Sequence, residues 1–415
     1  MAKQKTMAIL VGGGPAPGIN GIISAASIEA IKKGIKVLGI VDGFKWISKG
    51  DKSRIVELKL TNVSRIHFNG GSILRTSRVN PTKDPAMMDN VLKIFKELEV
   101  DYLITIGGDD TMFTASEIER LANGSIKIVH VPKTIDNDLP LPNRISTFGF
   151  QTAKHADVNI VRNIMEDSKT TGRWYLIVTM GRKAGHLAIG ICKAAGATLA
   201  VIPEEFPQES ISIAAVCDII EGSIIKRLAM GKDYGVAILA EGLALKIDEN
   251  ELKELSCVEK DEHDNVRIAE IDLGKIIKNE VKKRLKKNGL EITLVDKDIG
   301  YKLRCASPIP FDKEYTRDLG YGAVKFLMGG GSGAMVTLIG GKIEPLSFKD
   351  SIDPLTGKTK VRLVDIDTES YEVACEYMIK LNRGDLQNNE SVEKYAKVSN
   401  ITPDAFVEKF GYLAG

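Results

Sequence analysis

Short apolar runs alternate with longer segments of helical periodicity in the first third of the chain. Four of these runs read as strands: Met7–Val11, Lys36–Val41, Tyr102–Ile106 and Lys127–Val131. Two segments between them carry a helical pattern: Ile19–Lys33 and Met112–Leu121. Gly34 then stands where a helix commonly ends. Strands that alternate with helices in this way predict a parallel sheet covered by helices.

The alternation continues beyond Gly149, so we expect a second α/β unit to begin there. Further strands are predicted at Trp174–Thr179, Leu199–Ile202, Val236–Ala240 and Met335–Ile339. Further helices are predicted at Gln151–Asp167, Arg182–Ala195, Ser210–Met230 and Thr316–Leu327.

Three later segments carry a weaker pattern. Leu245–Lys297 is rich in Glu, Asp and Lys, and we expect a charged, exposed elaboration there rather than core. In the tail, Val361–Asp365 is predicted as a strand and Tyr371–Leu381 as a closing helix.

Composition excludes several classes of protein. The 415 residues carry 57 basic and 55 acidic side chains, and this net charge of +2 argues against nucleic acid as a partner. No apolar run reaches the roughly 18–20 residues of a membrane helix. The short polar stretch before Met7 lacks the apolar region of a signal peptide. The five cysteines are widely spaced and include no CxxC, so we expect a cytoplasmic protein without disulfides or a zinc site.

The candidate chemistry lies where predicted strands end, which is the ligand-binding edge of an open α/β sheet. Gly12–Asn20, with the sequence GGGPAPGIN, joins the first strand to the first helix. Glycines let backbone amides approach a phosphate, and a helix N-terminus favours the anion. The segment is neither GxGxxG nor a P-loop, so phosphate binding and an ordinary tight turn both stay open at this point.

Two neighbouring carboxylates follow the third strand. Gly107–Thr111, with the sequence GGDDT, contains Asp109 and Asp110. Mg²⁺ prefers one or two carboxylates together with water and phosphate oxygens, so the pair suits a magnesium site. Alternatively, Asp110 or Thr111 caps the following helix while Asp109 faces a ligand.

A lysine and an acidic turn follow the fourth strand, in Pro132–Asp138, with the sequence PKTIDND. Lys133 can neutralise a transferring phosphoryl group, and Asp136 can accept a proton from an attacking hydroxyl. An Asp-Asn-Asp turn is also common without any function.

More ionic residues flank the later strands. Arg182 is predicted at a helix start, where its guanidinium can face a phosphate, and Arg173 precedes the same strand. Glu241 suits sugar hydroxyls, and Tyr301 and Arg304 form a later pair.

The glycine-rich loop Gly70–Arg78 adds two cations, Arg75 and Arg78. The five histidines have no metal-ligand spacing and read as structural. Mg²⁺-dependent phosphoryl transfer to a phosphorylated sugar or polyol is indicated by the combination of these features at strand ends: glycine turns that can bind anions, paired carboxylates, a candidate base and several arginines.

These motifs resemble the 6-phosphofructokinase family. The matching segments are Gly13–Asn20, Gly107–Thr111, Pro132–Asp138, Met180–Arg182 and Ala240–Gly242. They follow the order of the family. The resemblance implies two Rossmann-like three-layer α/β domains with mostly parallel sheets and an active site in the cleft between them. It assigns residues 1–148 and about 305–355 to the donor and magnesium, and residues 149–304 and about 356–415 to the sugar phosphate.

The resemblance also implies a role for each matching residue. Asp136 is the implied general base, Lys133 and Arg182 are implied in catalysis, and Asp109 is the implied magnesium ligand. The implied donor contacts are Gly13, Gly14, Arg78, Asp110 and Lys133. The implied fructose 6-phosphate contacts are Thr134, Ile135, Asp136, Asp138, Arg173, Met180, Gly181, Arg182, Glu241, Tyr301 and Arg304. Relatives supply the counterpart of Arg173 from a neighbouring subunit, so we expect at least a homodimer.

Asp110 and Lys133 decide the expected donor. ATP-using relatives usually carry glycine at both positions, whereas pyrophosphate-dependent relatives carry the residues found here. A carboxylate at position 110 would repel the α-phosphate of ATP, and the Lys133 ammonium would stabilise charge on the phosphates. The expected reaction is reversible phosphoryl transfer from pyrophosphate to fructose 6-phosphate, giving fructose 1,6-bisphosphate and phosphate.

Two enzymatic alternatives stay open at this point: an ATP-dependent enzyme that tolerates Asp110, and the same chemistry on another sugar phosphate such as sedoheptulose 7-phosphate. An inactive regulatory subunit is disfavoured because Asp109 and Asp136 are both present. A nicotinamide-binding protein is disfavoured because the glycine loop lacks GxGxxG. Arg75, which stands where relatives usually have glycine, either contacts the donor or faces solvent.

Overall fold

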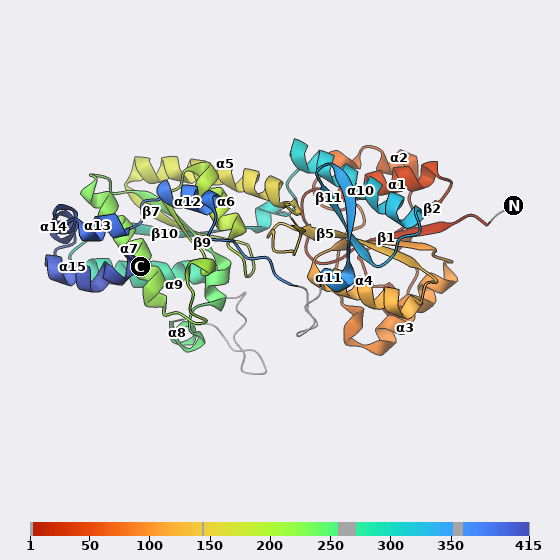
Figure 1. Ribbon diagram of the computed structural model, residues 1–415, viewed down its shortest axis with the longest axis horizontal. Coiled ribbons are helices and arrows are strands. Elements are labelled where there is room, and N and C mark those ends of the chain that lie inside the picture. Colours follow the sequence, from red (N-terminus) through yellow and green to blue (C-terminus); the bar gives the residue numbers. More distant parts are fainter. Residues whose placement is uncertain (1–2, 143–144, 256–270, 352–359, 415) are drawn as a thin grey trace. The chain divides into compact units, whose positions relative to one another are not determined.

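The computed structural model describes residues 3–142, 145–255, 271–351 and 360–414. The chain divides into two compact units, each built from two stretches of sequence (Figure 1). The first unit comprises Met1–Ala153 and Tyr301–Arg362, and the second comprises Lys154–Gly300 and Leu363–Gly415. The chain therefore passes from one unit to the other three times.

The first unit is built on a mostly parallel sheet. Its strands run in the order β12-β11-β5-β4-β1-β2-β3, and the short β6 also pairs with β5. The strand bounds are β1 Thr6–Val11, β2 Lys36–Ile40, β3 Ile55–Glu57, β4 Tyr102–Gly107, β5 Lys127–Thr134, β6 Phe148–Gly149, β11 Ala334–Ile339 and β12 Lys342–Ser347. Only the two edge strands, β3 and β12, are antiparallel to their neighbours. The central strands are almost entirely buried, as expected for a parallel sheet covered on both faces.

Helices cover both faces of this sheet, which gives three layers (Figure 1). On one face, α1 (Ile19–Lys32) packs against α10 (Pro310–Met328). A Cβ on Gly21 of α1 would lie 2.1 Å from Thr316 Oγ1, so glycine allows this close approach. On the other face, α3 (Pro85–Glu97) and α4 (Asp109–Ala122) bury apolar side chains in one core cluster. The short helices are α2 (Leu60–Val63) and α11 (Phe348–Ser351).

The second unit contains a parallel four-stranded sheet in the order β10-β7-β9-β8. The strand bounds are β7 Arg173–Thr179, β8 Leu199–Val201, β9 Gly235–Ala240 and β10 Thr293–Ile299. The helices are α5 Phe150–Thr171, α6 His186–Ala195, α7 Ile213–Ala229, α8 Glu249–Leu255, α9 Leu273–Lys287, α12 Glu369–Glu376, α13 Arg383–Gln387, α14 Asn389–Val398 and α15 Pro403–Phe410. Figure 1 shows α5 and α6 on one face of this sheet and α7 and α9 on the other.

The prediction for Leu245–Lys297 was wrong for part of that segment. Its described portion contains α9, which buries Leu273, Ile277 and Val281, and β10, which pairs with β7. Lysines on the exposed face of α9 hid this apolar stripe in the sequence. Residues 256–270 of the segment, with Cys257 and His263, lie outside the described residues.

The two predictions for the tail were also wrong in detail. Val361–Asp365 does not form a strand, because the Val364 N–H donates to the Glu204 carboxylate instead of to a neighbouring strand. The predicted closing helix begins as α12 but stops at Glu376. After it, the Ile379 N–H donates to the carbonyl of Thr198, which precedes β8.

Each unit contains one of the two tryptophans. Trp46 of the first unit is half-buried and donates its indole N–H to Asp42 at 2.9 Å. Trp174 of the second unit is fully buried in β7, against Gly235 of the neighbouring strand.

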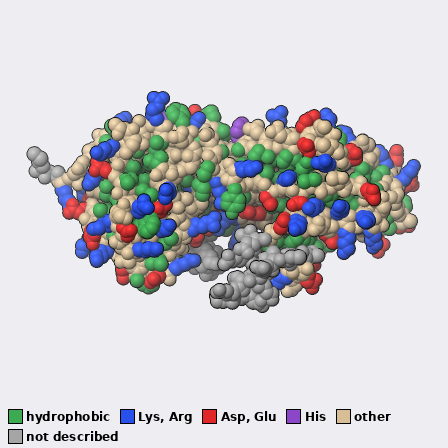
Figure 2. All heavy atoms as spheres, turned by 180° about the vertical axis from the view of Figure 1, so that it is seen from behind, with side chains coloured by type: hydrophobic (Ala, Val, Ile, Leu, Met, Phe, Trp, Pro, Cys, Tyr) green, Lys and Arg blue, Asp and Glu red, His purple; other side chains and the backbone are tan. Residues whose placement is uncertain are grey.

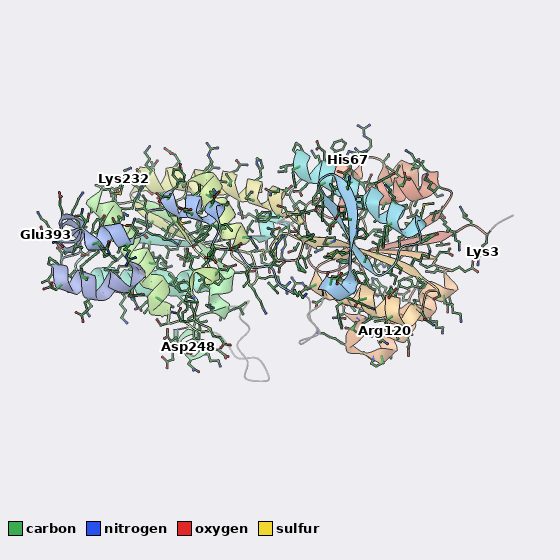
Figure 3. All side chains as sticks on the ribbon, in the orientation of Figure 1. Lys3, His67, Arg120, Lys232, Asp248 and Glu393 are labelled. Carbon is green, nitrogen blue, oxygen red and sulfur yellow. The ribbon has the colours of Figure 1, made fainter. Side chains whose placement is uncertain are left out.

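Charged side chains such as Lys3, Arg120, Lys232 and Glu393 project away from the sheets (Figure 3). Acidic and basic side chains are interspersed over the face seen in Figure 2. Within the described ranges, no helix is both long enough and apolar enough to cross a bilayer.

Candidate active site

The glycine-rich segment turns sharply at the end of β1. The Gly12 N–H donates to Ile106 O at 2.9 Å, and the Gly13 N–H donates to Ser77 O at 2.8 Å. Thr76 Oγ1 donates in return to Gly13 O at 2.6 Å. Gly13 has a φ of 81°, in the left-handed region that glycine adopts without strain. These bonds fix the turn against β4 and against the loop that carries Arg78.

Lys133 lies beneath this turn at the end of β5. Its side chain is 5% exposed, and its Nζ donates to Gly14 O at 2.5 Å. Burial lowers the pKa of Lys133 to about 8. The carboxylates of Asp136 and Asp109 oppose that shift, whereas the guanidinium of Arg304 adds to it. Residues from three loops therefore share one electrostatic environment around this ammonium.

The Asp109–Asp110 pair occupies the first turn of α4. The helix starts at Asp109, earlier than the predicted Met112, and Gly108 is its N-cap without a side-chain hydrogen bond. The suggested cap at Asp110 or Thr111 was therefore wrong. Both carboxylates lie at the positive end of the helix dipole. Asp109 is half-buried and Asp110 is exposed.

The acidic turn after β5 is held by its own side chains. Thr134 Oγ1 accepts from the Asp136 N–H at 3.0 Å. Asn137 has a φ of 59°, and its Oδ1 accepts from the Thr147 N–H at 3.0 Å. Asn is one of the few residue types that tolerate this left-handed conformation. The turn leaves Asp136 half-buried, whereas Ile135 and Asp138 are buried.

Arg304 reaches the glycine turn from the loop before α10. A Cβ on Gly14 would lie 3.7 Å from the Arg304 guanidinium, which is ordinary van der Waals contact, so the guanidinium lies directly beside this turn. The guanidinium also stacks over Tyr301, 4.9 Å from the ring centroid, and Tyr301 is 79% exposed. Arg78 is exposed beside the same turn. Arg75 points to Asp42 at 4.0 Å.

A second group of predicted residues lies at the carboxyl edge of the sheet in the second unit. Glu241, directly after β9, accepts from the Gly181 N–H at 3.1 Å and from the Arg182 N–H at 2.6 Å. Glu241 therefore fixes the Met180–Arg182 turn with one carboxylate oxygen. Arg182 has a φ of 53° and an exposed side chain. It does not start a helix as predicted, because α6 begins at His186.

Arg173 lies away from this second group. It is the first residue of β7, whereas Met180 directly follows the last. At about 3.3 Å per residue, the two ends of the strand are about 20 Å apart. The exposed Arg173 side chain therefore cannot reach the turn that Glu241 holds in its own chain.

Two residues that support the first group carried no signal in the sequence. His130 is fully buried, and burial lowers its pKa to about 3. The neutral ring pairs with Thr105 Oγ1 at 2.9 Å and with Gly107 O at 3.0 Å, just before Asp109. The second residue, Arg362, binds the acidic turn from a tail segment in which we predicted only a strand.

The structure thus brings six predicted residues of the first unit together around the Lys133 ammonium: Gly13, Gly14, Asp109, Asp136, Asp138 and Arg304. The other predicted residues of this unit adjoin them in sequence or contact: Arg78, Asp110, Thr134, Ile135 and Tyr301. An ammonium, a guanidinium and backbone amides can neutralise phosphate oxygens, and a half-buried carboxylate beside them can accept a proton. The second unit brings Met180, Gly181, Arg182 and Glu241 together and leaves Arg173 apart.

The chain is similar to known proteins over nearly its whole length. The family model described as phosphofructokinase matches residues 6–327. The chain is 52% identical to the pyrophosphate--fructose 6-phosphate 1-phosphotransferase of Thermotoga maritima over 409 residues, which are 97% of each chain. It is 48% identical to the protein of the same name from Naegleria fowleri, over 98% of this chain and 95% of that one.

A solved structure shows the same fold. The pyrophosphate-dependent phosphofructokinase of Nitrosospira multiformis superposes with a TM-score of 0.69 and 17% identity, over 90% of each chain. The predicted fold class, α/β with mostly parallel sheets, is confirmed.

Proposed function

This chain belongs to the phosphofructokinase family, and from that premise we propose that it transfers a phosphoryl group reversibly from pyrophosphate to the 1-hydroxyl of fructose 6-phosphate. The products are fructose 1,6-bisphosphate and phosphate. The observation that carries the proposal is the buried Lys133 ammonium, which binds the glycine turn and lies in the field of Asp109 and Asp136. The names of the two most similar relatives given above support the same donor and acceptor.

Asp136 is the proposed general base. Its carboxylate accepts the proton of the 1-hydroxyl while that oxygen attacks the phosphorus of pyrophosphate. The bond between that phosphorus and the bridging oxygen breaks, and phosphate leaves. Lys133, Arg78 and the amide of Gly14 neutralise the charge that develops on the phosphate oxygens. Gly13, whose own N–H is bound to Ser77 O, gives the turn its left-handed backbone.

The donor preference rests on Asp110 and Lys133. Asp110 is exposed in the first turn of α4, where its charge would face the α-phosphate of a nucleotide. Two charges about 4 Å apart interact by about 1–4 kcal/mol in surroundings of this kind. Because about 1.4 kcal/mol is a factor of ten, one such repulsion disfavours ATP about fivefold or more.

Asp109 is the proposed ligand of Mg²⁺. Among the described residues, no group of three or more His, Cys, Asp or Glu side chains could enclose a metal. A half-buried carboxylate fits Mg²⁺ in another way, because this ion takes one or two carboxylates and completes its shell with water and phosphate oxygens. When bound, Mg²⁺ neutralises the phosphates. Asp109 would then hold the ion beside Lys133.

The sugar-phosphate contacts are proposed for Thr134, Ile135, Asp136 and Asp138 in the first unit and for Met180, Gly181, Arg182 and Glu241 in the second. Tyr301 and Arg304 are proposed for the 6-phosphate. Arg173 is proposed to serve the site of a neighbouring subunit in a homo-oligomer, which its place at the far end of β7 supports. We also propose a cytoplasmic location, which is supported by the free thiols of Cys192, Cys217, Cys305 and Cys375.

The test is a parallel assay of fructose 6-phosphate phosphorylation with Mg²⁺ and either pyrophosphate or ATP. We expect turnover with pyrophosphate, and reversal with fructose 1,6-bisphosphate and phosphate. Asp136→Asn keeps the shape of the side chain but removes the base, so turnover should fall by about 10²–10⁴-fold while substrate still binds. Activity with ATP alone would overturn the donor assignment, and near-normal turnover of Asp136→Asn would overturn its role as the base.

A further inference from the structure

Arg362 is the last residue of the first unit and binds the acidic turn with its whole guanidinium. Its Nε donates to Asn137 O at 3.0 Å, and its Nη2 donates to Asn137 Oδ1. Its Nη1 donates to Ile145 O at 2.8 Å and, more weakly, to Leu141 O at 3.4 Å. The backbone N–H of Arg362 donates to Asp138 O at 2.8 Å.

All of these bonds end on the segment that follows Asp136. Asn137 holds its left-handed conformation while both its carbonyl oxygen and its side-chain oxygen accept from one guanidinium. A planar fork with fixed donor directions orients such a pair of acceptors in a way that a lysine cannot. The peptide bond between Asn137 and Asp138 and the Asn137 side chain are thereby fixed, directly after the residue from which the Asp136 side chain extends.

The environment of Arg362 is unusual for a residue that only anchors a tail. Burial lowers the pKa of its guanidinium, and the nearby Asp138 carboxylate opposes that shift. Burying a guanidinium costs free energy unless its donors are satisfied, and here they are satisfied mainly by carbonyl oxygens of a single loop.

We infer that Arg362 is a positioning residue for the phosphoryl transfer proposed above: it holds the turn at Asn137 so that the Asp136 carboxylate stays in place to accept the proton of the sugar hydroxyl. The inference rests on the proposed function. It assigns to Arg362 a larger effect on turnover than on substrate binding, because the guanidinium contacts the loop and not the substrate itself.

The experiment compares wild-type enzyme with Arg362→Ala and Arg362→Lys in the pyrophosphate assay. A shift of about 1 Å in the position of a catalytic group can lower the rate about 10²-fold, so the kcat of Arg362→Ala should fall by about that factor. The KM for pyrophosphate should stay near that of the wild type, and the KM for fructose 6-phosphate should rise by a smaller factor than the fall in kcat. Arg362→Lys should be intermediate. Added guanidinium ion should restore part of the kcat of Arg362→Ala, because it can occupy the emptied site.

Arg284→Ala is the matched control. Arg284 lies in α9 of the second unit, is partly buried, and binds Asp218 at 2.8 Å and Glu280 at 2.9 Å. Its loss should lower the unfolding midpoint without a kcat defect that guanidinium relieves. If folded Arg362→Ala has wild-type kcat, or a raised KM at unchanged kcat, or a defect that guanidinium leaves unchanged, the inference is wrong.

If Arg362→Ala does not fold, Asn137→Gly takes its place, since glycine keeps the left-handed backbone and removes the Oδ1 acceptor that Arg362 shares with the Thr147 N–H. It should lose kcat by a smaller factor than Arg362→Lys at unchanged KM for pyrophosphate, and an unchanged kcat would contradict the inference. A wild-type enzyme that uses ATP alone would overturn only the donor, and the same comparisons then run with ATP. If the wild-type enzyme shows no turnover with either donor, both the proposed function and the inference are wrong.

Discussion

Lys133 is almost fully buried, and its ammonium donates to Gly14 O in the glycine turn that we propose binds the donor. The low dielectric around it disfavours the charged form, and Asp109 and Asp136 only partly compensate. A bound anion would supply the missing compensation. In the proposed site, the buried ammonium of Lys133 would therefore lower the stability of the empty protein and strengthen the binding of a phosphate.

The lowered pKa of Lys133 makes the free energy of unfolding depend on pH. The pKa of Lys133 is lowered from 10.5 to about 8, so the unfolded chain binds the proton more tightly than the folded one. Stability should therefore rise as the pH increases from about 8 to 10.5, by up to about 3 kcal/mol from this group. Urea unfolding at pH 7.5 and pH 10 should show this gain in the wild type relative to Lys133→Met. Equal pH dependence of the two proteins would mean that the Lys133 pKa is not lowered.

Candidate site residues could be chosen from the sequence because most of them follow buried strands, and strand ends meet at one edge of a sheet. The sequence could not predict how they are held. Arg362 and Asn137 are 225 positions apart, and only the folded chain pairs them. Likewise, Glu241 suggested a sugar contact, whereas the structure shows one of its oxygens bound to the Gly181 and Arg182 amides.

At the scale of elements, the strands were predictable wherever burial on both faces left a continuous apolar run, as in β1, β4, β7 and β9. The prediction failed where one face is exposed. In α9, charged residues outnumber the buried ones, and β10 is an edge strand whose residues alternate only in part. The edge strands β3 and β12 also escaped prediction, because both are largely exposed.

One contact between helices gives a prediction at this scale. Asp312, in the first turn of α10, is fully buried and accepts from the N–H groups of Gly149 and Thr152 at 2.8 Å each. It thus satisfies backbone donors at the N-terminal end of α5 from a different helix. Asp312→Ala leaves those donors buried without partners and should lower the free energy of unfolding by about 2–4 kcal/mol.

Urea unfolding of Asp312→Ala checks this value, with Asp318→Ala as the control. Asp318 is exposed on the same helix, so its loss should change stability by no more than about 0.5 kcal/mol. Asp312→Asn keeps one acceptor oxygen and should lie between the two. Similar stabilities of Asp312→Ala and Asp318→Ala would show that the contact between α10 and α5 contributes little.

At the scale of the whole molecule, neither unit is continuous in sequence. The predicted motifs lie in both units, and Arg173 lies too far along β7 to join the Met180–Arg182 turn of its own chain. If Arg173 completes the site of a neighbour, each active site of a homo-oligomer requires two chains.

Subunit complementation measures this requirement directly. Asp136→Asn and Arg173→Ala should each be almost inactive alone. After mixing, dissociation and random reassociation, a site has an intact base and an intact arginine in about a quarter of cases, so about a quarter of wild-type activity should return. Asp136→Asn mixed with Lys133→Met should recover nothing, because both residues belong to one site of one chain. Absence of recovery in the first mixture would place Arg173 outside any shared site.

The two tryptophans give each unit its own fluorophore. Trp174 is enclosed in β7 and emits from dry surroundings, whereas Trp46 is half-buried beside Asp42 and three cationic side chains, so its emission lies at longer wavelength. Spectra taken during unfolding therefore resolve the two units without any added label. Replacement of either indole by phenylalanine leaves a single reporter. The order in which the units unfold can then be followed as a shift of the tryptophan emission maximum.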